Sequence, residues 1–267
     1  MRITALYTHP VKGCHRVEHA TARVEPWGLA GDRRWAMVDA EGIAITQRDT
    51  SLLTQLSVTP RAGGLLLQAP GLAPLEVAEP VDGPEEFVRV FRSKPPVPAR
   101  VAEKEWSSQF LGRDVRLVWQ ADPAGRAIES HARPGEPVSF ADGFPLLLAN
   151  EASLSALNDW LAEAGDEPVP MTRFRPNLVV GGAEPWAEDD WLGGRLRIGG
   201  LSFRAAKECS RCVVTTIDQE TGEKGRQPLR MLGKRRRFET GLLFAINLIP
   251  DELGYLRLGD TVEVPTG

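Results

Sequence analysis

Short apolar runs separated by turn residues dominate the hydrophobic pattern of the chain. The runs are rich in β-branched and aromatic side chains and are bounded by Gly, Pro, Asp or Asn, which is typical of β-strands joined by turns. Regular alternation of strand and helix is missing, so the pattern disfavours a doubly wound parallel sheet and predicts a mainly β (α+β) fold. The predicted strands cover residues 3–8, 34–39, 65–68, 87–91, 115–119, 177–182, 196–205, 213–218, 242–249 and 261–264.

Two segments have a helical period instead. In the longer segment, residues 150–165, Asn150 is a candidate N-cap, apolar residues repeat at i, i+3 and i+7 from Leu154, and Gly165 is a stop signal. The shorter segment, residues 102–112, would bury its aromatic side chains and end at a glycine. Both helices are predicted to pack through their apolar faces.

Two loop-like stretches suggest how the chain is divided. Residues 93–101 are rich in proline, and residues 120–137 are polar with several Pro and Gly residues. Domain boundaries commonly fall in such segments. We therefore expect an N-terminal β-rich domain over residues 1–120 and a second domain over residues 121–267.

The composition excludes several classes of protein. With 267 residues, of which 42% are hydrophobic and 25% charged, the chain can form one large or two moderate globular domains. A formal net charge of −4 gives no general cationic field, so nucleic acid and membrane surfaces are not expected partners. The N-terminus lacks the apolar core of a secretory signal and no apolar run reaches about 18 residues, so we expect a cytoplasmic location.

Cys209 and Cys212 lie three residues apart and could serve several chemistries. Because a strand-like run follows them, a thioredoxin-type redox pair is disfavoured. A zinc site would need two further ligands from distant parts of the chain, and both thiols could instead be small buried side chains. One of them could also present a single thiolate, from the edge of a strand, to a transition metal held by other soft ligands. The remaining zinc-ligand candidates are Cys14, His9, His15, His19 and His131.

Several stretches together resemble a known family. In chain order, "HPVKGC", "GDRRWAMVD", "LLLANEASLSALN", "TRFRPNLVV" and "KECSRCVVTTIDQETG" are similar to the MOSC superfamily, named after the molybdenum cofactor sulfurase C-terminal domain. The resemblance covers nearly the whole chain. Within the superfamily it points to the two-part proteins exemplified by the mitochondrial amidoxime reducing component and the bacterial N-hydroxylaminopurine-resistance proteins. It implies an N-terminal β-rich domain packed on a MOSC β-barrel, with a few peripheral helices and a cofactor in the groove between them.

The resemblance also implies the cofactor and its contacts. The cofactor is the molybdenum cofactor, in which a pterin dithiolene holds the metal, and Cys212 is implied as an additional sulfur ligand and a catalytic residue. Asp218 is a candidate proton relay. Cationic side chains suit the phosphate tail of the pterin, and the start of the helix at Asn150 offers unpaired N–H groups. The implied cofactor-binding residues are Lys12, Gly13, Arg33, Asn150, Ser153, Arg175, Asn177 and Arg211.

The implied reaction is the two-electron reduction of a small N-hydroxylated compound to its amine. The sequence contains neither the cysteine spacing of a plant-type ferredoxin nor a pyridoxal-phosphate-dependent desulfurase half, so a separate electron donor of ferredoxin or flavin-reductase type is expected. Two alternatives stay open: a molybdenum cofactor carrier without turnover, and a zinc or structural binding module. The basic run 234–237 is either a solvated loop or a docking surface for an acidic electron-transfer partner.

Overall fold

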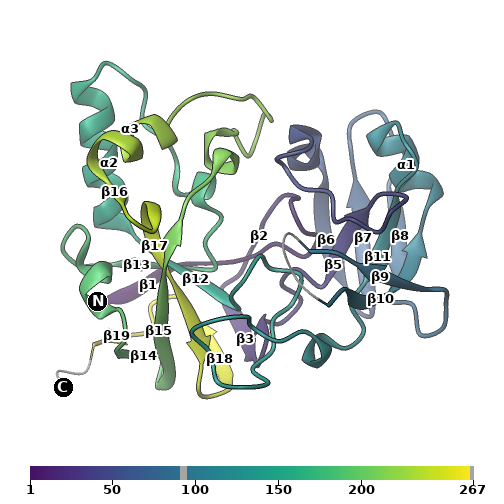
Figure 1. The fold of residues 1–267 in the computed structure, drawn as a ribbon, viewed down its shortest axis with the longest axis horizontal. Helices are drawn as coiled ribbons and strands as arrows, with labels where there is room; N and C mark the ends of the chain where they lie inside the picture. Colours follow the sequence, from purple (N-terminus) through teal and green to yellow (C-terminus); the bar gives the residue numbers. More distant parts are fainter. Residues whose placement is uncertain (91–94, 265–267) are drawn as a thin grey trace.

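Strands make up most of the secondary structure, which confirms the predicted mainly β class (Figure 1). The structure is a computed structural model and describes residues 1–90 and 95–264. These residues form two β-rich halves, which lie side by side in Figure 1. The half on the left contains one large sheet, and the half on the right contains two smaller sheets.

The large sheet has nine strands among the described residues and combines both ends of the chain. Its order is β19-β14-β15-β17-β12-β13-β1-β2, with β16 paired to β17. Only β12 and β13 run parallel among these described pairs, and helix α2 makes the crossover that parallel neighbours require. The strands are β1 (Arg2–Thr8), β2 (Val17–Glu18), β12 (Leu146–Asn150), β13 (Leu178–Gly181), β14 (Arg195–Ile198), β15 (Leu201–Ser210), β16 (Arg237–Phe238), β17 (Gly241–Pro250) and β19 (Val262–Glu263).

Two helices, α2 (Glu151–Glu163) and α3 (Leu229–Arg235), pack on the large sheet. Leu157 and Leu161 of α2 are fully buried, as their spacing predicted, and they share one core cluster with Phe244 of the sheet. Burying such side chains is the main source of helix stability in a protein of this kind.

The predicted cap of the longer helix and the glycine stops of both helices are confirmed, whereas the shorter helix begins at Glu105 and not at residue 102, because residues 102 and 103 belong to a strand. The side chain of Asn150 caps α2 by accepting a hydrogen bond from the backbone N–H of Ala152 at 3.0 Å, and Gly165 follows the helix with φ 75°. Helix α1 (Glu105–Leu111) ends at Gly112, whose φ of 64° suits a residue without a Cβ. Among the described residues, no helix has both the length and the apolar character needed to cross a membrane.

The other half contains a four-stranded sheet, β5-β11-β10-β9, and a three-stranded sheet, β6-β7-β8. Trp106 and Phe110 of α1 stack with ring centroids 5.7 Å apart and join the core of this half. The last residue of the predicted strand 87–91 and the first two of the predicted loop 93–101 lie outside the described residues. The strands are β5 (Trp35–Val38), β6 (Ser57–Arg61), β7 (Gly64–Gln68), β8 (Leu75–Ala78), β9 (Glu85–Val88), β10 (Val97–Glu103) and β11 (Arg116–Trp119).

The first thirty residues pair with the C-terminal half. Strand β1 lies inside the large sheet, and β3 (Thr21–Glu25) pairs with both β18 (Gly254–Arg257) and β4 (Gly28–Leu29). Leu6 of β1 is 1% exposed and belongs to the core cluster of the large sheet. Strand pairing therefore joins the beginning of the chain to its C-terminal half. The domain division expected near residue 120 stays a prediction.

The strand predicted over residues 213–218 is wrong. Strand β15 contains Cys209 and ends at Ser210, and Cys212 is followed directly by a short 3₁₀ helix, η5 (Val213–Thr216). The hydroxyls of Thr215 and Thr216 donate to carbonyls three residues earlier, at 3.0 and 2.8 Å. Such local bonds compete with a strand ladder, and here they fix a turn. The other 3₁₀ helices described are η1 (Ser51–Gln55), η2 (Pro123–Gly125), η3 (Met171–Phe174) and η4 (Ala187–Trp191).

We predict that Leu6→Ala lowers the free energy of unfolding by about 2–5 kcal/mol, because the change leaves a cavity in the core of the large sheet. Urea unfolding followed by tryptophan fluorescence measures the change. Val81→Ala is the control: this side chain is 79% exposed, and the expected change is within about 0.5 kcal/mol. Equal stabilities of the two variants would contradict the packing of β1 in the core of the large sheet.

Candidate functional site

A cavity of about 620 Å³ is lined by residues of both halves of the chain. One side comes from the loops after β1 and β5, and the other comes from the C-terminal end of β15 and the turn that follows it. Its size lies within the usual range for small-molecule and cofactor sites. Seven of the ten predicted site residues line it: Lys12, Gly13, Arg33, Arg175, Asn177, Arg211 and Cys212.

Asp142 links two cations at the cavity wall. Lys12 is buried, and its Nζ donates to the Phe140 carbonyl oxygen at 2.8 Å and to the Asp142 carboxylate at a shorter distance. Arg48 donates to the second Asp142 oxygen at 3.2 Å. Burial lowers the pKa of Lys12, and Asp142 opposes that change. Burial alone would raise the pKa of Asp142, but Lys12 and Arg48 hold it well below its usual value, so this carboxylate stays charged at neutral pH.

Arg126 fixes the loop that carries Asp142. This buried guanidinium donates to the carbonyl oxygens of Ser139, Ala141 and Asp142, the latter two at 2.5 and 3.2 Å. Burial lowers the pKa of Arg126 to about 10. The position of the acidic side chain therefore depends on a second arginine behind it.

Arg33 and Arg175 lie against each other and also line the cavity. Arg33 donates to the Asp32 carboxylate, to Asn177 Oδ1 at 3.1 Å and to the Arg175 carbonyl oxygen at 3.3 Å. Arg175 donates to the Cys14 carbonyl oxygen at 2.9 Å, and its Nη2 is buried without a hydrogen-bond partner among the described residues. Burial, followed by the charge of Arg33, lowers the pKa of Arg175 to about 9. An anion beside the two guanidiniums would relieve both effects.

Gly13 occupies a position that only glycine fits. Its φ is +81°, and a Cβ there would approach Leu53 Cδ1 to 2.9 Å. Its carbonyl oxygen accepts a hydrogen bond from Gln47 Nε2 at 2.7 Å, and Gln47 also pairs with Gln219. The residue after Lys12 thus offers backbone atoms, and no side chain, to the cavity.

Cys212 opens into the cavity from the start of η5. Its Sγ accepts a hydrogen bond from Arg48 at 3.4 Å, and its carbonyl oxygen accepts the N–H of Thr215 at 3.1 Å. Cys209 also lines the cavity, but it packs partly against the core, and its Sγ accepts a hydrogen bond from Arg211 at 2.7 Å. The pairing of β15 with β17 shifts register between Ala205 and Lys207 and again between Glu208 and Ser210, on either side of Cys209, which changes the direction of the strand end. A turn, rather than the predicted strand edge, therefore presents the thiol.

The cavity has an excess of positive charge. Buried and half-buried cations repel one another, and the Arg211 Nε atom, like Arg175 Nη2, is buried without a partner. This donor set suits an anionic group with several oxygen atoms. The cations are Lys12, Arg33, Arg48, Arg175, Lys207 and Arg211, and the carboxylates are Asp142 and Glu208.

Two family models match this chain in sequence order. Residues 1–114 match the MOSC N-terminal beta barrel domain, and residues 135–263 match the MOSC domain. Mitochondrial amidoxime reducing component 2 of Rattus norvegicus is 30% identical over 286 residues, which cover 97% of this chain and 82% of the relative. The chain belongs to the MOSC family. The resemblance expected from the sequence is therefore confirmed.

Other relatives fall into two named groups. Mitochondrial amidoxime-reducing component 1 of Homo sapiens is 29% identical over 283 residues, covering 97% of this MOSC chain and 82% of the relative. Molybdenum cofactor sulfurase of Danio rerio is 31% identical over 254 residues, covering 88% of the chain but 30% of the relative. The family's association with the molybdenum cofactor agrees with the cofactor predicted from the sequence. The predicted cytoplasmic location stays a prediction, because the first group is named mitochondrial.

Three predicted site residues of this MOSC protein lie away from the cavity. Asn150 and Ser153 are buried, and both donate to Glu188, at 2.9 and 2.8 Å. Asp218 accepts the N–H groups of two following residues and pairs with Arg173 at 3.1 Å, so it stabilises a turn. We therefore correct these assignments: hydrogen bonds inside the fold already occupy the three side chains.

Arg48 and Asp142 are the site residues that sequence reasoning missed. Arg48 follows a short loop, and Asp142 belongs to an Asp-Gly pair, which is an ordinary turn signal. They are 94 residues apart in the chain and meet only in the folded protein. No local pattern could have identified this contact.

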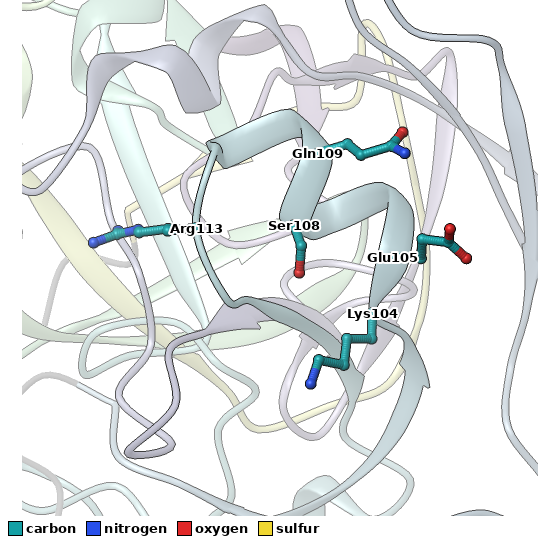
Figure 2. A pocket seen from close by; sticks show the side chains of 5 residues that line it. All are labelled: Lys104, Glu105, Ser108, Gln109 and Arg113. Carbon is teal, nitrogen blue, oxygen red and sulfur yellow. The ribbon is translucent and has the colours of Figure 1, made fainter.

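A second hollow lies on α1. It is lined by Lys104, Glu105, Ser108, Gln109 and Arg113. Figure 2 shows that the side chains of Gln109 and Arg113 extend away from each other. No convergent set of polar groups forms there among the described residues, so the cavity beside Cys212 is the better candidate site.

The three thiols should differ in reactivity, because only a deprotonated and accessible thiol is alkylated. Burial raises the pKa of Cys14 to about 12, whereas Cys209 and Cys212 are partly exposed. In folded protein without cofactor, iodoacetamide at pH 8 is expected to modify Cys209 and Cys212 and to leave Cys14 intact, as measured by peptide mass spectrometry. In guanidinium chloride all three should react. Modification of Cys14 as fast as Cys212 in the folded protein would contradict the structure.

Proposed function

We propose that the cavity binds the molybdenum cofactor and that the protein uses it to reduce small N-hydroxylated compounds. The observation that carries the proposal is the thiol of Cys212 opening into a cavity whose polar wall is mostly cationic. Relatives named amidoxime-reducing components, matched over 97% of the chain, support this activity over others.

The residues at the cavity fit the parts of this cofactor. Its phosphate needs several donors, and the unpartnered Nη2 of Arg175 beside Arg33 offers them. A dithiolene-bound metal accepts a further soft ligand, which the sulfur of Cys212 can supply. Lys12 adds a compact positive charge at the opposite wall.

Around the bound group, the protein acts mainly by holding charges and donors in place. Arg48 donates to the sulfur of Cys212 and is itself held by Asp142, so three side chains from distant segments fix the thiol position. Arg126 holds the Asp142 loop from behind. Rigid placement of this kind is what a metal site requires of its supporting residues.

The proposed reaction consumes two electrons and two protons: R–NH–OH + 2e⁻ + 2H⁺ gives R–NH₂ + H₂O. The cofactor, when bound, supplies a metal that exchanges the two electrons. The electrons originate from a separate donor protein, since no redox group other than this cofactor is proposed for the chain. A small open cavity with a cationic wall can admit an uncharged hydroxylamine or amidoxime beside Cys212.

A carrier that binds the cofactor and hands it on is the second candidate. The match to molybdenum cofactor sulfurase of Danio rerio favours it, because that relative is as similar in sequence as the reductase-type relatives. The two functions differ in one observable property, which is turnover.

The test uses protein produced in a host that makes the cofactor. We expect about one molybdenum per chain and reduction of an aromatic amidoxime by reduced methyl viologen. Cys212→Ser is expected to lower turnover at least about 100-fold, because the change replaces a metal ligand. Cys209→Ser is the matched control and should retain most of the activity. Bound metal without turnover would favour the carrier, and absence of molybdenum from every preparation would contradict both.

A further inference from the structure

A strongly basic face lies beside the cavity, on α3 and the turn before it. Between Lys224 and Arg237 the chain has seven basic residues and no acidic one, although its formal net charge is −4. The side chain of Arg236 is buried, and the other six are exposed. We call these six the basic face: Lys224, Arg226, Arg230, Lys234, Arg235 and Arg237.

The basic face is held on a fixed helix. Residues 234–237 were expected as a solvated loop or a docking surface, and they form the last residues of α3, its C-cap and the first residue of β16. Arg236 pairs with Asp189 at 2.6 Å and lies 4.3 Å above the ring centroid of Trp186. Arg235 lies over Trp160 at 5.7 Å. Residues 234–237 are therefore not a loop, and their exposed charges are preorganised for contact.

Most of the basic face has no internal counter-charge. Arg235 is 3.5 Å from Glu163, and both side chains are more than half exposed, so this pair contributes little. No carboxylate among the described residues pairs with the other five side chains. Concentrated charge of one sign attracts a partner of the opposite sign and accelerates its association.

The helix that carries half of the basic face packs against elements that line the cavity. Helix α3 contacts η5, the turn that begins at Cys212. Phe174 of the cavity wall stacks on Phe244 with centroids 3.7 Å apart, and Phe244 meets Trp186 at 6.0 Å, edge to face. Trp186 in turn supports Arg236. A molecule on the basic face is thus connected to the cavity by contiguous aromatic rings.

We propose that the basic face docks an acidic one-electron carrier protein that supplies the cavity, an inference that rests on the proposed reductase function. Two successive dockings deliver the two electrons of one turnover. The exposed Phe238, 47% accessible beside Arg236, adds the aromatic contact typical of protein interfaces. A long nucleic acid is disfavoured, because the rest of the chain is acidic and would repel it.

The experiment compares two charge-reversal double variants of the cofactor-loaded protein. Lys234→Glu/Arg237→Glu changes the basic face. Arg61→Glu/Arg113→Glu makes the same change in charge in the other half, where both side chains are exposed. The probe is an acidic [2Fe–2S] ferredoxin, used reduced for the rate of amidoxime reduction and oxidised for its Kd. Reduced methyl viologen measures turnover without docking, and melting temperatures check folding.

At about 20 mM salt, the basic-face variant is expected to lose about tenfold or more in ferredoxin-driven rate and in affinity, and the control less than about twofold. The difference should disappear at about 0.5 M salt, where surface charges are screened. Viologen-driven turnover should be the same in all three proteins.

Equal ferredoxin rates and Kd values for the two double variants would overturn the proposal. Tighter binding of a single-stranded oligonucleotide, lost in the same basic-face variant, would overturn it in favour of a nucleic-acid surface. If viologen drives no turnover in any protein, the reductase function fails, and the Kd values for ferredoxin still decide whether the basic face docks the carrier.

Discussion

Mutual repulsion among cations at the junction of the two halves is the constraint on which the site depends. Lys12, Arg33 and Arg175 reach this place from separate segments, and burial together with like charge lowers the pKa of Lys12 and of Arg175. The fold offsets this with two carboxylates. Asp142 bonds Lys12, and Asp32, whose pKa is lowered to about 2 chiefly by Arg33 against the effect of burial, bonds Arg33. The compensation is incomplete, which leaves the cavity attractive to an anion.

The interlocked topology explains how these side chains meet. Strand β1 is anchored in the large sheet and ends at Thr8, so the loop after it delivers Lys12 to the cavity at a fixed position. The long strand β15 belongs to the same sheet and ends at Ser210, shortly before Cys212. Because strands of one hydrogen-bonded sheet support both walls, with β17, β12 and β13 between β15 and β1, the distance between cations and thiol is set by strand pairing. The same sheet carries α3, which brings the basic face near the thiol.

The sequence was informative where local rules decide structure. The helical spacing of apolar residues, together with a capping residue and glycine stops, predicted α2 and α1. Short runs of β-branched and apolar residues predicted most of the strands. The same propensities failed at residues 213–218, where two threonine hydroxyls turn the backbone into a 3₁₀ helix. Asn150 and Ser153 looked available at a helix start, but Glu188, more than thirty residues later, occupies both. Seven of the proposed cofactor contacts came from family resemblance, whereas Arg48 and Asp142 required the folded structure.

Anomalous diffraction at the molybdenum absorption edge, from crystals of protein produced with the cofactor, tests the central claim most directly. The account predicts one strong peak within bonding distance of the Cys212 sulfur, on the side of the cavity that Arg48 faces. A peak at Cys209, a peak outside the cavity, or an ordered crystal without any molybdenum signal would contradict it.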